Sequence, residues 1–363
     1  MILLAVSPGS GALRAPQIAR ELSEAGQEVR VLLESKTTSF VGPAAFGGRI
    51  VEEVADAPEA LIFAPASTGT LARLAHGLAD GSAERAYAAG VRPAIVVPEL
   101  DKATREHLAV RENLRLLRED GCRALEGSGE DMASPEGIVN EVLNALGGPL
   151  SGLRVLVTTG GTREPVDKVR VISNRSSGKM GQAIAREAYR RGAKVTVVAA
   201  NMEGKEPGYR WVDVATYAEV EEVTTALARE ADALIMAAAV SDFTPARVEE
   251  GKIRRGGTKE LDLKLVPTGD ILKAVRESNP KLFMVGFAAT HGDPVADARE
   301  KLATKDVNLV VGNDISSEGS GFGSDENEVH VVGRKGERFV PRAPKAEVAR
   351  VILDALAQEI GEQ

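Results

Sequence analysis

Short apolar runs alternate with segments of helical spacing along most of the chain. Near the N-terminus, an apolar run at 2–6 precedes a loop at 7–11, a helical segment at 16–25 and a second apolar run at 29–33. Uninterrupted apolar runs of this length are typical of strands that are covered on both faces, as in parallel sheets. The pattern therefore predicts a βαβ unit and an α/β fold.

The same pattern starts again in the second half of the chain. The helical spacing of residues 138–146 stops at the sequence GGPLSG (147–152), which is the best candidate for a linker. A strand is expected at 153–158. We therefore predict two tandem Rossmann-like or flavodoxin-like domains, each with three layers and a mainly parallel sheet, over residues 1–148 and 151–363.

The remaining elements follow the same alternation. Further strands are expected at 60–64, 94–97, 194–199, 233–238, 282–287 and 309–311, and helices at 179–191, 217–230, 269–277 and 294–305. Two segments differ. In KIRRGGTKELDLKLV (252–266), charged and apolar residues alternate around two glycines, which predicts a two-stranded arm. The Gly- and Ser-rich stretch 316–325 predicts a flexible loop.

Composition narrows the class of protein. The net charge of −8 argues against bulk attraction to nucleic acid or to an anionic membrane. The one cysteine, Cys122, excludes a disulfide within the chain and a cysteine-rich zinc site, and the four histidines lack metal-ligand spacing. The first apolar run has no basic segment before it, and no apolar stretch is long enough to span a bilayer. We therefore expect a soluble, cytoplasmic protein.

A glycine pair marks the end of the strand predicted at 153–158. The sequence there is TTGGTREP (158–165), and in doubly wound sheets ligands bind outside the carboxyl ends of the strands. Glycines allow backbone N–H groups to approach a phosphate, and Thr and Arg side chains can add contacts. The candidate ligand contacts are Gly160, Gly161, Thr162 and Arg163. The alternative is an ordinary tight turn.

A second candidate segment, RVISNRSSGKMG (170–181), leads directly into a predicted helix. Its Ser and Gly residues predict an N-cap with exposed amides, and its basic residues suit an anionic ligand. The alternative is a capped helix with solvated basic residues. Neither a P-loop nor a GxGxxG fingerprint is present. The candidate residues are Arg170, Asn174, Ser176, Ser177, Gly178 and Lys179.

Small residues end another predicted strand, in AAAVSD (237–242). Ala237 and Ala238 leave room for a flat ring or a ribose, and Asp242 could hold a ribose hydroxyl or a metal-bound water. The alternative for Asp242 is a helix cap. Five basic candidates lie further along the chain, and for each the alternative is a solvated surface. They are Lys252, the Arg254-Arg255 pair, and Lys301 with Lys305, which are one helical turn apart.

Together these segments resemble a known family. Residues 151–340 are similar to the phosphopantothenate–cysteine ligase domain of bacterial coenzyme A biosynthesis. The matching strings occur in family order and spacing: GGTREPVDKVRVISNRSSGKMG, AAAVSDFTP, KI (252–253), GDIL (269–272), VGFAAT (285–290), KLATKDVNLVVGNDI and GFGSDENEV.

The resemblance implies roles for the matching positions. Arg170 and Asn174 match residues that bind and turn over an activated acyl intermediate. The segment Thr268, Gly269, Asp270, Ile271 matches a CTP-contacting turn, although the family has Asn-Pro-Asp where this chain has Thr-Gly-Asp. Other positions that match the lining of the CTP site are Ala238, Asp242, Lys252, Phe287, Lys301 and Lys305.

The implied reaction joins 4′-phosphopantothenate to L-cysteine. The carboxylate attacks the α-phosphate of CTP to give an acyl-cytidylate and pyrophosphate, and the cysteine amine then displaces CMP. Mg²⁺ and lysines would neutralise the triphosphate. Our hypothesis is that Lys252 stabilises the departing charge. The resemblance also implies a homodimer formed through the ligase domain, while the choice between CTP and ATP stays open.

The N-terminal half resembles the flavin-dependent decarboxylase that is usually fused to this ligase. The strings ILLAVSPGSGALRAPQIARELSEAGQEVRVLL, IFAPASTGTLARLAHGLAD and ENLRLLREDG carry this resemblance, but its catalytic parts are missing. The expected His aligns near Val51, Asp101 replaces an Asn, and the Cys-containing flap is reduced to LEGSGEDM (125–132). Cys122 lies before the flap, and we interpret it as structural.

We therefore predict a ligase with a catalytically inactive decarboxylase-like domain. Whether FMN is still bound stays open, because Ser7–Gly11 and Ala66–Thr70 could line a phosphate or be turns. The alternatives are a bifunctional flavoprotein that has replaced its catalytic residues, and a non-catalytic regulator that binds pantothenate or a nucleotide. A nicotinamide dehydrogenase is a weaker alternative because the dinucleotide fingerprint is absent.

Overall fold

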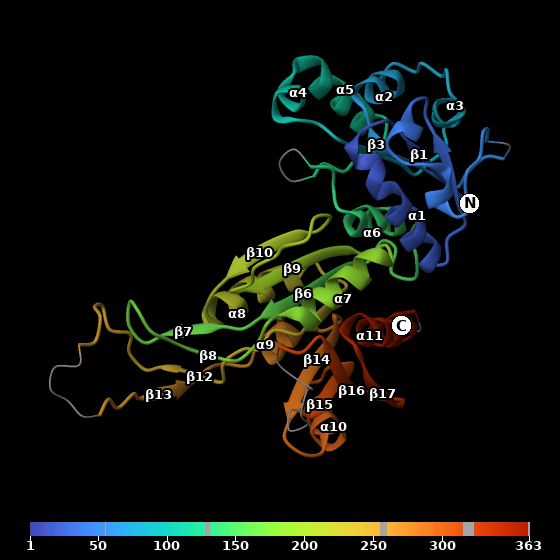
Figure 1. Ribbon diagram of the computed structural model, residues 1–363. Helices are drawn as coiled ribbons and strands as arrows, with labels where there is room; N and C mark the ends of the chain where they lie inside the picture. The colour runs from blue at the N-terminus through green and yellow to red at the C-terminus, as the bar shows by residue number, and fades with distance from the viewer. Residues whose placement is uncertain (55, 128–130, 255–259, 315–322, 362–363) are drawn as a thin grey trace. The chain divides into compact units, whose positions relative to one another are not determined.

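A computed structural model describes residues 1–54, 56–127, 131–254, 260–314 and 323–361 (Figure 1). The chain divides into two compact units, Met1–Leu146 and Gly147–Gln363. Each unit has a mainly parallel sheet with helices on its faces, so the predicted α/β class is confirmed. Arg255, residues 128–130 of the shortened flap and residues 316–322 of the expected flexible loop lie outside the described residues.

The first unit is built on a five-stranded parallel sheet in the order β2-β1-β3-β4-β5. The element bounds are β1 (Ile2–Val6), η1 (Ser10–Arg14), α1 (Ala15–Glu24), β2 (Val29–Leu33), η2 (Thr37–Ser39), η3 (Pro43–Phe46), β3 (Ala60–Ala66), α2 (Thr68–Ala75), α3 (Ser82–Ala88), β4 (Ala94–Pro98), α4 (Lys102–Glu106), α5 (Leu108–Glu119), β5 (Arg123–Ala124) and α6 (Pro135–Leu146).

Alternate residues of β1 face two separate cores of this unit. Ile2, Leu4 and Val6 belong to the core that α1 and α6 cover, whereas Leu3 and Ala5 belong to the core under α2, α3 and α5. All five side chains are at most 2% exposed. A strand that is buried on both faces reads as one continuous apolar run, which is why the sequence pattern located β1.

The second unit contains an eight-stranded sheet in the order β10-β9-β6-β11-β14-β15-β16-β17, of which the first six strands are parallel. The last two pair antiparallel. The strand bounds are β6 (Arg154–Gly160), β9 (Lys194–Ala200), β10 (Arg210–Val214), β11 (Ala233–Met236), β14 (Phe283–Thr290), β15 (Leu309–Asp314), β16 (Glu326–Gly333) and β17 (Gly336–Pro344).

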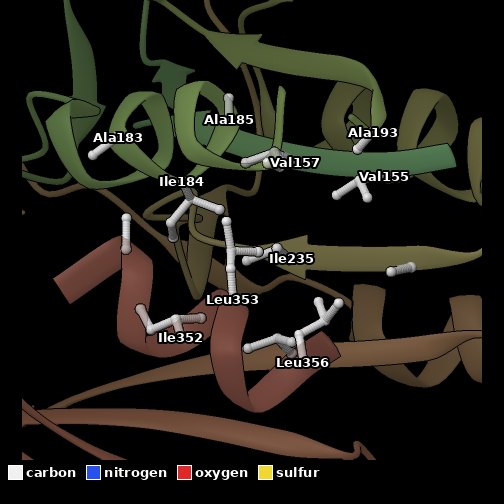
Figure 2. Close-up of a cluster of buried hydrophobic side chains, with 14 of the residues drawn as sticks. Val155, Val157, Ala183, Ile184, Ala185, Ala193, Ile235, Ile352, Leu353 and Leu356 are labelled. Carbon is white, nitrogen blue, oxygen red and sulfur yellow. The ribbon is translucent and has the colours of Figure 1, made fainter. Parts of the chain in front are cut away.

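Five helices cover the two faces of this sheet. Two of them, α7 (Lys179–Arg190) and α11 (Lys345–Ile360), enclose one core with the sheet. The other face is covered by α8 (Tyr217–Ala228), α9 (Ile271–Ser278) and α10 (Pro294–Thr304). Figure 2 shows part of the first core, with the labelled residues Val155, Val157, Ala183, Ile184, Ala185, Ala193, Ile235, Ile352, Leu353 and Leu356.

The core around α11 allows a stability prediction. Leu353 is 0% exposed and packs in this cluster (Figure 2). Truncation to Ala leaves a cavity that the surrounding side chains fill only in part, so we expect Leu353→Ala to cost about 3 kcal/mol. For a unit of this size that lowers the Tm by about 6–12 °C in a calorimetric scan. Gln358→Ala on the exposed side of the same helix is the control, and an equal loss in both variants would contradict the packing argument.

The two-stranded arm predicted for residues 252–266 is wrong. The described residues 252–254 and 260–264 belong to no strand. Instead, β13 (Leu265–Pro267) pairs antiparallel with β12 (Phe243–Pro245), and a separate antiparallel pair joins β7 (Arg163–Pro165) to β8 (Val171–Ser173). Alternation of charged and apolar residues favours a strand, but the pairing partner was a segment far away in sequence.

Most other boundaries agree with the prediction to within three residues. The strand predicted at 233–238 ends at Met236, because the backbone of Ala237–Asp242 leaves the sheet and bonds elsewhere. The strand predicted at 309–311 extends to Asp314. In the described part of the chain, no helix has the length and apolar character that a membrane span requires.

Candidate functional site

A cavity of about 440 Å³ opens at the carboxyl ends of the parallel strands of the second unit. Volumes in this range are typical of sites for small molecules and cofactors. The cavity brings together fifteen of the residues that the sequence analysis selected: Asn174, Ser176, Ser177, Gly178, Lys179, Ala237, Ala238, Asp242, Thr268, Gly269, Asp270, Ile271, Phe287, Lys301 and Lys305.

The start of α7 forms one wall of the cavity. Gly178 has φ +70, and the Ser176 hydroxyl accepts from its amide at 3.3 Å. Gly178 is the N-cap residue of α7, as the Ser- and Gly-containing segment predicts, and no side-chain hydrogen bond caps the helix there. Gly181 lets the helix approach β6, because a Cβ at this position would lie 2.3 Å from Thr159 Oγ1. The uncapped helix start therefore presents backbone N–H donors of the kind that bind anions.

A chain of hydrogen bonds holds the segment after β11. The amide of Thr162 donates to Ala239 O at 3.2 Å, and the Thr162 hydroxyl accepts from the amide of Ser241 at 3.0 Å. Asn174 Nδ2 donates to Val240 O at 3.0 Å. This segment therefore joins the turn after β6 to the loop before α7. Asp242 is exposed at the cavity and caps no helix, so the helix-cap alternative for it is wrong.

The turn between β13 and α9 forms the opposite wall. The Thr268 hydroxyl donates to Ser241 O at 2.8 Å, and the Thr268 amide donates to Asp242 O at 2.9 Å. Asp270 caps α9 by accepting from the amide of Lys273 at 3.2 Å. The turn is thus anchored at both ends although it has Gly where the family has Pro.

Two lysines from α10 and the residue after it reach this wall. Lys301 Nζ donates to Phe287 O at 2.5 Å, and Lys305 Nζ donates to Asp270 Oδ2 at 2.6 Å. Burial and then the neighbouring charge of Lys305 lower the pKa of Lys301. Burial alone would raise the pKa of Asp270, but the bonds from Lys305 and the Lys273 amide outweigh it and keep that pKa low.

Seven of the selected residues that the structure describes do not line the cavity: Gly160, Gly161, Thr162, Arg163, Arg170, Lys252 and Arg254. Position 160 needs glycine for a structural reason. Its φ is +86, and a Cβ at this position would lie 2.0 Å from Ala200 O. Arg170 donates to Asp167 Oδ2 at 2.6 Å and to Ile253 O at 3.2 Å. Ile253 N in turn donates to Asp167 at 3.0 Å, so Lys252 is held next to the Arg170 loop.

Twelve described residues of the cavity lining were not predicted from the sequence. Asn313 lies near the carboxyl end of β15, and a polar residue at such a position is a sequence signal for a ligand site. Lys345 carries no such sequence signal, because it is the first residue of α11, far from the other cavity segments in the sequence. The remaining residues of the lining are Met180, Gly181, Tyr217, Met236, Ala239, Val240, Ser241, Leu272, Ala289 and Asn327.

Tyr217 explains why the turn contains Gly269. The Tyr217 hydroxyl donates to Glu221 at 2.7 Å, and a Cβ at position 269 would lie 2.6 Å from that hydroxyl. We expect Gly269→Ala to displace the turn and to lower the free energy of unfolding by about 1–3 kcal/mol, as for other overpacked sites. Adding Tyr217→Phe removes the clashing oxygen, so the double variant should recover most of the loss. Calorimetric scans measure the effect, and equal Tm values for the single and double variants would contradict this explanation.

The candidate residues of the first unit are placed differently. Asp101 caps α4 by accepting from the amide of Thr104 at 2.8 Å. Cys122 is buried in the connection between α5 and β5, as predicted, and burial raises the pKa of its thiol to about 12. It is therefore protonated at neutral pH and unsuited to nucleophilic attack. Val51, which aligns near the missing His, belongs to no helix or strand.

Comparisons with known proteins place both halves of the chain. The family described as "DNA/pantothenate metabolism flavoprotein C-terminal domain" matches residues 150–360, and the family described as "Flavoprotein" matches residues 1–147. Among solved structures, the C-terminal domain of a coenzyme A biosynthesis bifunctional protein CoaBC is 32% identical with a TM-score of 0.51, over 59% of this chain and 99% of that chain.

Two curated relatives match along nearly their whole length. The coenzyme A biosynthesis bifunctional protein CoaBC of Bacillus subtilis (strain 168) is 32% identical over 402 residues, which covers 100% of this chain and 98% of the relative. The protein of the same name from Escherichia coli (strain K12) is 32% identical over 398 residues, with the same coverage. The chain therefore belongs to the family of coenzyme A biosynthesis bifunctional proteins.

Proposed function

We propose that this protein joins 4′-phosphopantothenate to L-cysteine with CTP as the energy source. The observation that carries the proposal is the charge of the cavity. The charged residues of its lining are four lysines and two aspartates: Lys179, Lys301, Lys305, Lys345, Asp242 and Asp270. The cavity is therefore net positive, although the whole chain has a net charge of −8. Both a triphosphate and a phosphorylated carboxylic acid are polyanions, and such a lining concentrates and holds them.

The lysines form two groups in this proposal. Lys301 and Lys305 lie with Asp270 at the turn before α9. Lys179 lies at the start of α7, where its Nζ donates to Asp325 Oδ1 at 2.6 Å. Burial is the main cause of the lowered pKa of Lys345, and the neighbouring charge of Lys179 is the second cause. Two separate cationic groups suit a reaction in which two anionic substrates must be held close to each other.

The first chemical step would form the activated acid. A carboxylate oxygen of phosphopantothenate attacks the α-phosphorus of CTP, the bond to the β-phosphate oxygen breaks, and pyrophosphate leaves with the bonding electrons. The uncapped amides of α7 and the lysine ammonium groups would stabilise the charge that develops on the phosphates. Mg²⁺ would enter as the partner of the triphosphate, with Asp242 exposed at the cavity to meet it or its waters.

The second step would form the amide. The cysteine amine attacks the acyl carbon, the acyl–oxygen bond breaks, CMP leaves with the electron pair, and the nitrogen releases a proton. Asn174 lies in the cavity wall with an amide that can bond the acyl oxygen and is too weak a nucleophile to compete. Arg170 would hold the loop that carries Lys252, whose ammonium would stabilise the departing charge.

A single assay tests this function. Purified protein with phosphopantothenate and Mg²⁺ should release pyrophosphate with CTP and more slowly with ATP, and adding L-cysteine should yield phosphopantothenoylcysteine and CMP. Lys252→Ala should slow the cysteine-dependent formation of phosphopantothenoylcysteine and CMP. Nucleotide binding without pyrophosphate release from either CTP or ATP would overturn the enzyme assignment and favour a binding regulator.

The same assay separates a ligase from a bifunctional enzyme. Product analysis by mass detects loss of CO₂ from phosphopantothenoylcysteine. We propose that this second reaction is absent, because Asp101 is engaged as a helix cap and the buried Cys122 stays protonated. A decarboxylated product formed by the pure protein would contradict this part of the proposal. We further propose a homodimer, which light scattering can test.

A further inference from the structure

We propose that the first unit excludes the phosphate of a flavin, because two carboxylates of the chain itself, Glu34 and Glu99, occupy the donors that a phosphate would need. The family match to flavoproteins implies that FMN binds in this unit. The residues present do not fit that group. The inference stands apart from the ligase reaction, which belongs to the second unit.

The strand order locates where a flavin phosphate would bind. In a sheet of order 2-1-3-4-5, the chain reverses direction of winding between β1 and β3, and ligands bind at this switch point outside the carboxyl ends of the strands. In this unit the loops there are the segment after β1, from Ser7 to Gly11, and the segment after β3, from Ser67 to Thr70. Both contain the hydroxyl and amide donors that suit a phosphate.

Glu99 occupies the donors after β1. Its carboxylate accepts from the Ser10 hydroxyl and, at 2.9 Å, from the amide of Gly11. It also fills the space above the loop, since a Cβ at Gly9 would lie 2.5 Å from Glu99 Oε2. The carboxylate therefore lies where a loop of this kind would receive a phosphate oxygen.

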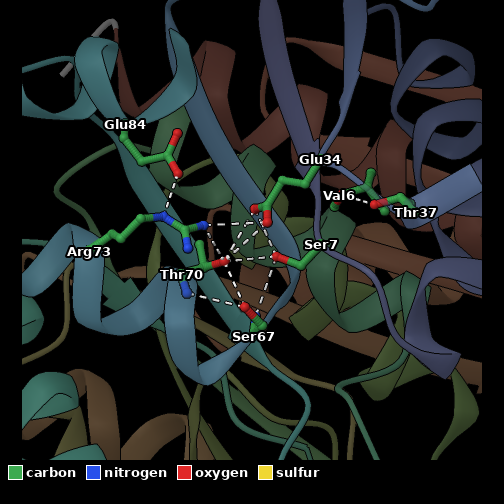
Figure 3. A network of polar contacts seen from close by, with 8 residues as sticks. All are labelled: Val6, Ser7, Glu34, Thr37, Ser67, Thr70, Arg73 and Glu84. Carbon is green, nitrogen blue, oxygen red and sulfur yellow. Dashed lines mark hydrogen bonds and ion pairs between the residues drawn. The ribbon is translucent and has the colours of Figure 1, made fainter. Parts of the chain in front are cut away.

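Glu34 occupies hydroxyl donors of both segments, Ser7 after β1 and Thr70 after β3. It accepts from the Ser7 hydroxyl at 2.8 Å and from the Thr70 hydroxyl at 3.2 Å (Figure 3). Thr70 is 0% exposed and Ser7 is 1% exposed, so their hydroxyls depend on partners within the protein. Ser67 completes the network, since its side chain lies 2.9 Å from the Thr70 hydroxyl.

The one cation in this network does not restore an anion site. Arg73 lies 3.4 Å from Glu34 and 2.9 Å from Glu84, so two carboxylates already share its charge (Figure 3). With Glu99 on the neighbouring loop, a phosphate dianion placed here would meet carboxylates and lose the donors that they hold. Like charges at such distances repel strongly where water is partly excluded.

The test removes the negative charges of Glu34 and Glu99 and keeps the shapes of both side chains. The double variant Glu34→Gln, Glu99→Gln retains acceptor oxygens for the hydroxyl and amide donors. Each form of the full chain is titrated with FMN and, separately, with riboflavin, which lacks the phosphate, and binding is followed by flavin fluorescence. Glu28→Gln is the matched control, because Glu28 is an exposed carboxylate before β2, at the opposite end of the strand from Glu34.

We expect the wild-type protein and Glu28→Gln to be purified without a flavin band and to bind FMN no better than riboflavin. The double variant should bind FMN at least tenfold more tightly than wild type, with no gain for riboflavin. If circular dichroism shows that the double variant is unfolded, the same FMN and riboflavin titrations are made with Glu99→Gln alone. Micromolar FMN binding by the wild type, no gain in the variant, or an equal gain for riboflavin would each overturn the proposal.

Discussion

Replacing Asn174 with Asp should lower the kcat of the proposed ligation by roughly 100- to 1000-fold, the range measured when a donor to a developing negative charge is removed. Asn174 Nδ2 donates to Val240 O at 3.0 Å. An Asp of nearly the same shape would place a carboxylate oxygen against that carbonyl oxygen. It would also add a negative charge to a cavity that is proposed to take polyanions and would lose the donor to the acyl oxygen.

The control for this result has the same local chemistry away from the cavity. Asn279 Nδ2 donates to Ala228 O at 2.9 Å, and Asn279 lies just after α9, outside the cavity lining. Asn279→Asp therefore makes the same exchange of amide for carboxylate against a backbone carbonyl. We expect it to lower the Tm and to leave kcat per folded molecule within about twofold. Equal losses of kcat in both variants would show that Asn174 acts only through stability.

Lys301→Met should have the second largest effect, on nucleotide binding. The charged hydrogen bond that Lys301 can offer to a phosphate or a base is worth about 1.5–3 kcal/mol, which corresponds to roughly 10- to 160-fold in kcat/KM for CTP. Met fills nearly the same volume beside Phe287 and the half-buried wall, so the fold should persist. Initial rates over a range of CTP concentrations measure the effect, and an unchanged KM for CTP would remove Lys301 from the nucleotide site.

The lowered pKa of Lys301 adds a pH signature. Because burial and the charge of Lys305 favour the neutral amine, Lys301 loses its proton at a lower pH than an ordinary lysine. As pH rises through that value, the ammonium disappears and kcat/KM for CTP should fall. Lys301→Arg keeps its charge across this range, so the alkaline fall should move to higher pH. The same alkaline limb in wild type and Lys301→Arg would assign the fall to another group.

The fold class followed from local pattern because its strands are buried on both faces. β1 and β2 were located to the residue, and the two series of alternating runs predicted two α/β units. The antiparallel end of the second sheet, β16 and β17, was not predicted. Its strands alternate apolar and polar residues only in part, and which strand pairs with which depends on contacts distant in sequence.

The sequence predicted which chain segments form the candidate site, but it did not predict the contacts between those segments. Strand ends and small residues indicated where ligands bind, since parallel strands deliver their carboxyl ends to one edge of a sheet. The sequence did not show that Asn174 bonds to Val240 O or that Tyr217 fills the space beside Gly269. Neither did it indicate Lys345, which joins the cavity from the last helix of the chain.

The amino-acid sequence alone determined the α/β class, the repeated start of the pattern near residue 153, the missing decarboxylase residues and most of the cavity-lining segments. These depend on residue type and on periodicity, which are local properties. Only the tertiary structure decided that Lys301 is a half-buried cation beside Lys305, that Arg170 binds Ile253 O, and that Glu34 and Glu99 occupy the donors of the flavin-type loops. Burial, charge pairing and the filling of donors depend on which distant residues the folded chain brings into contact.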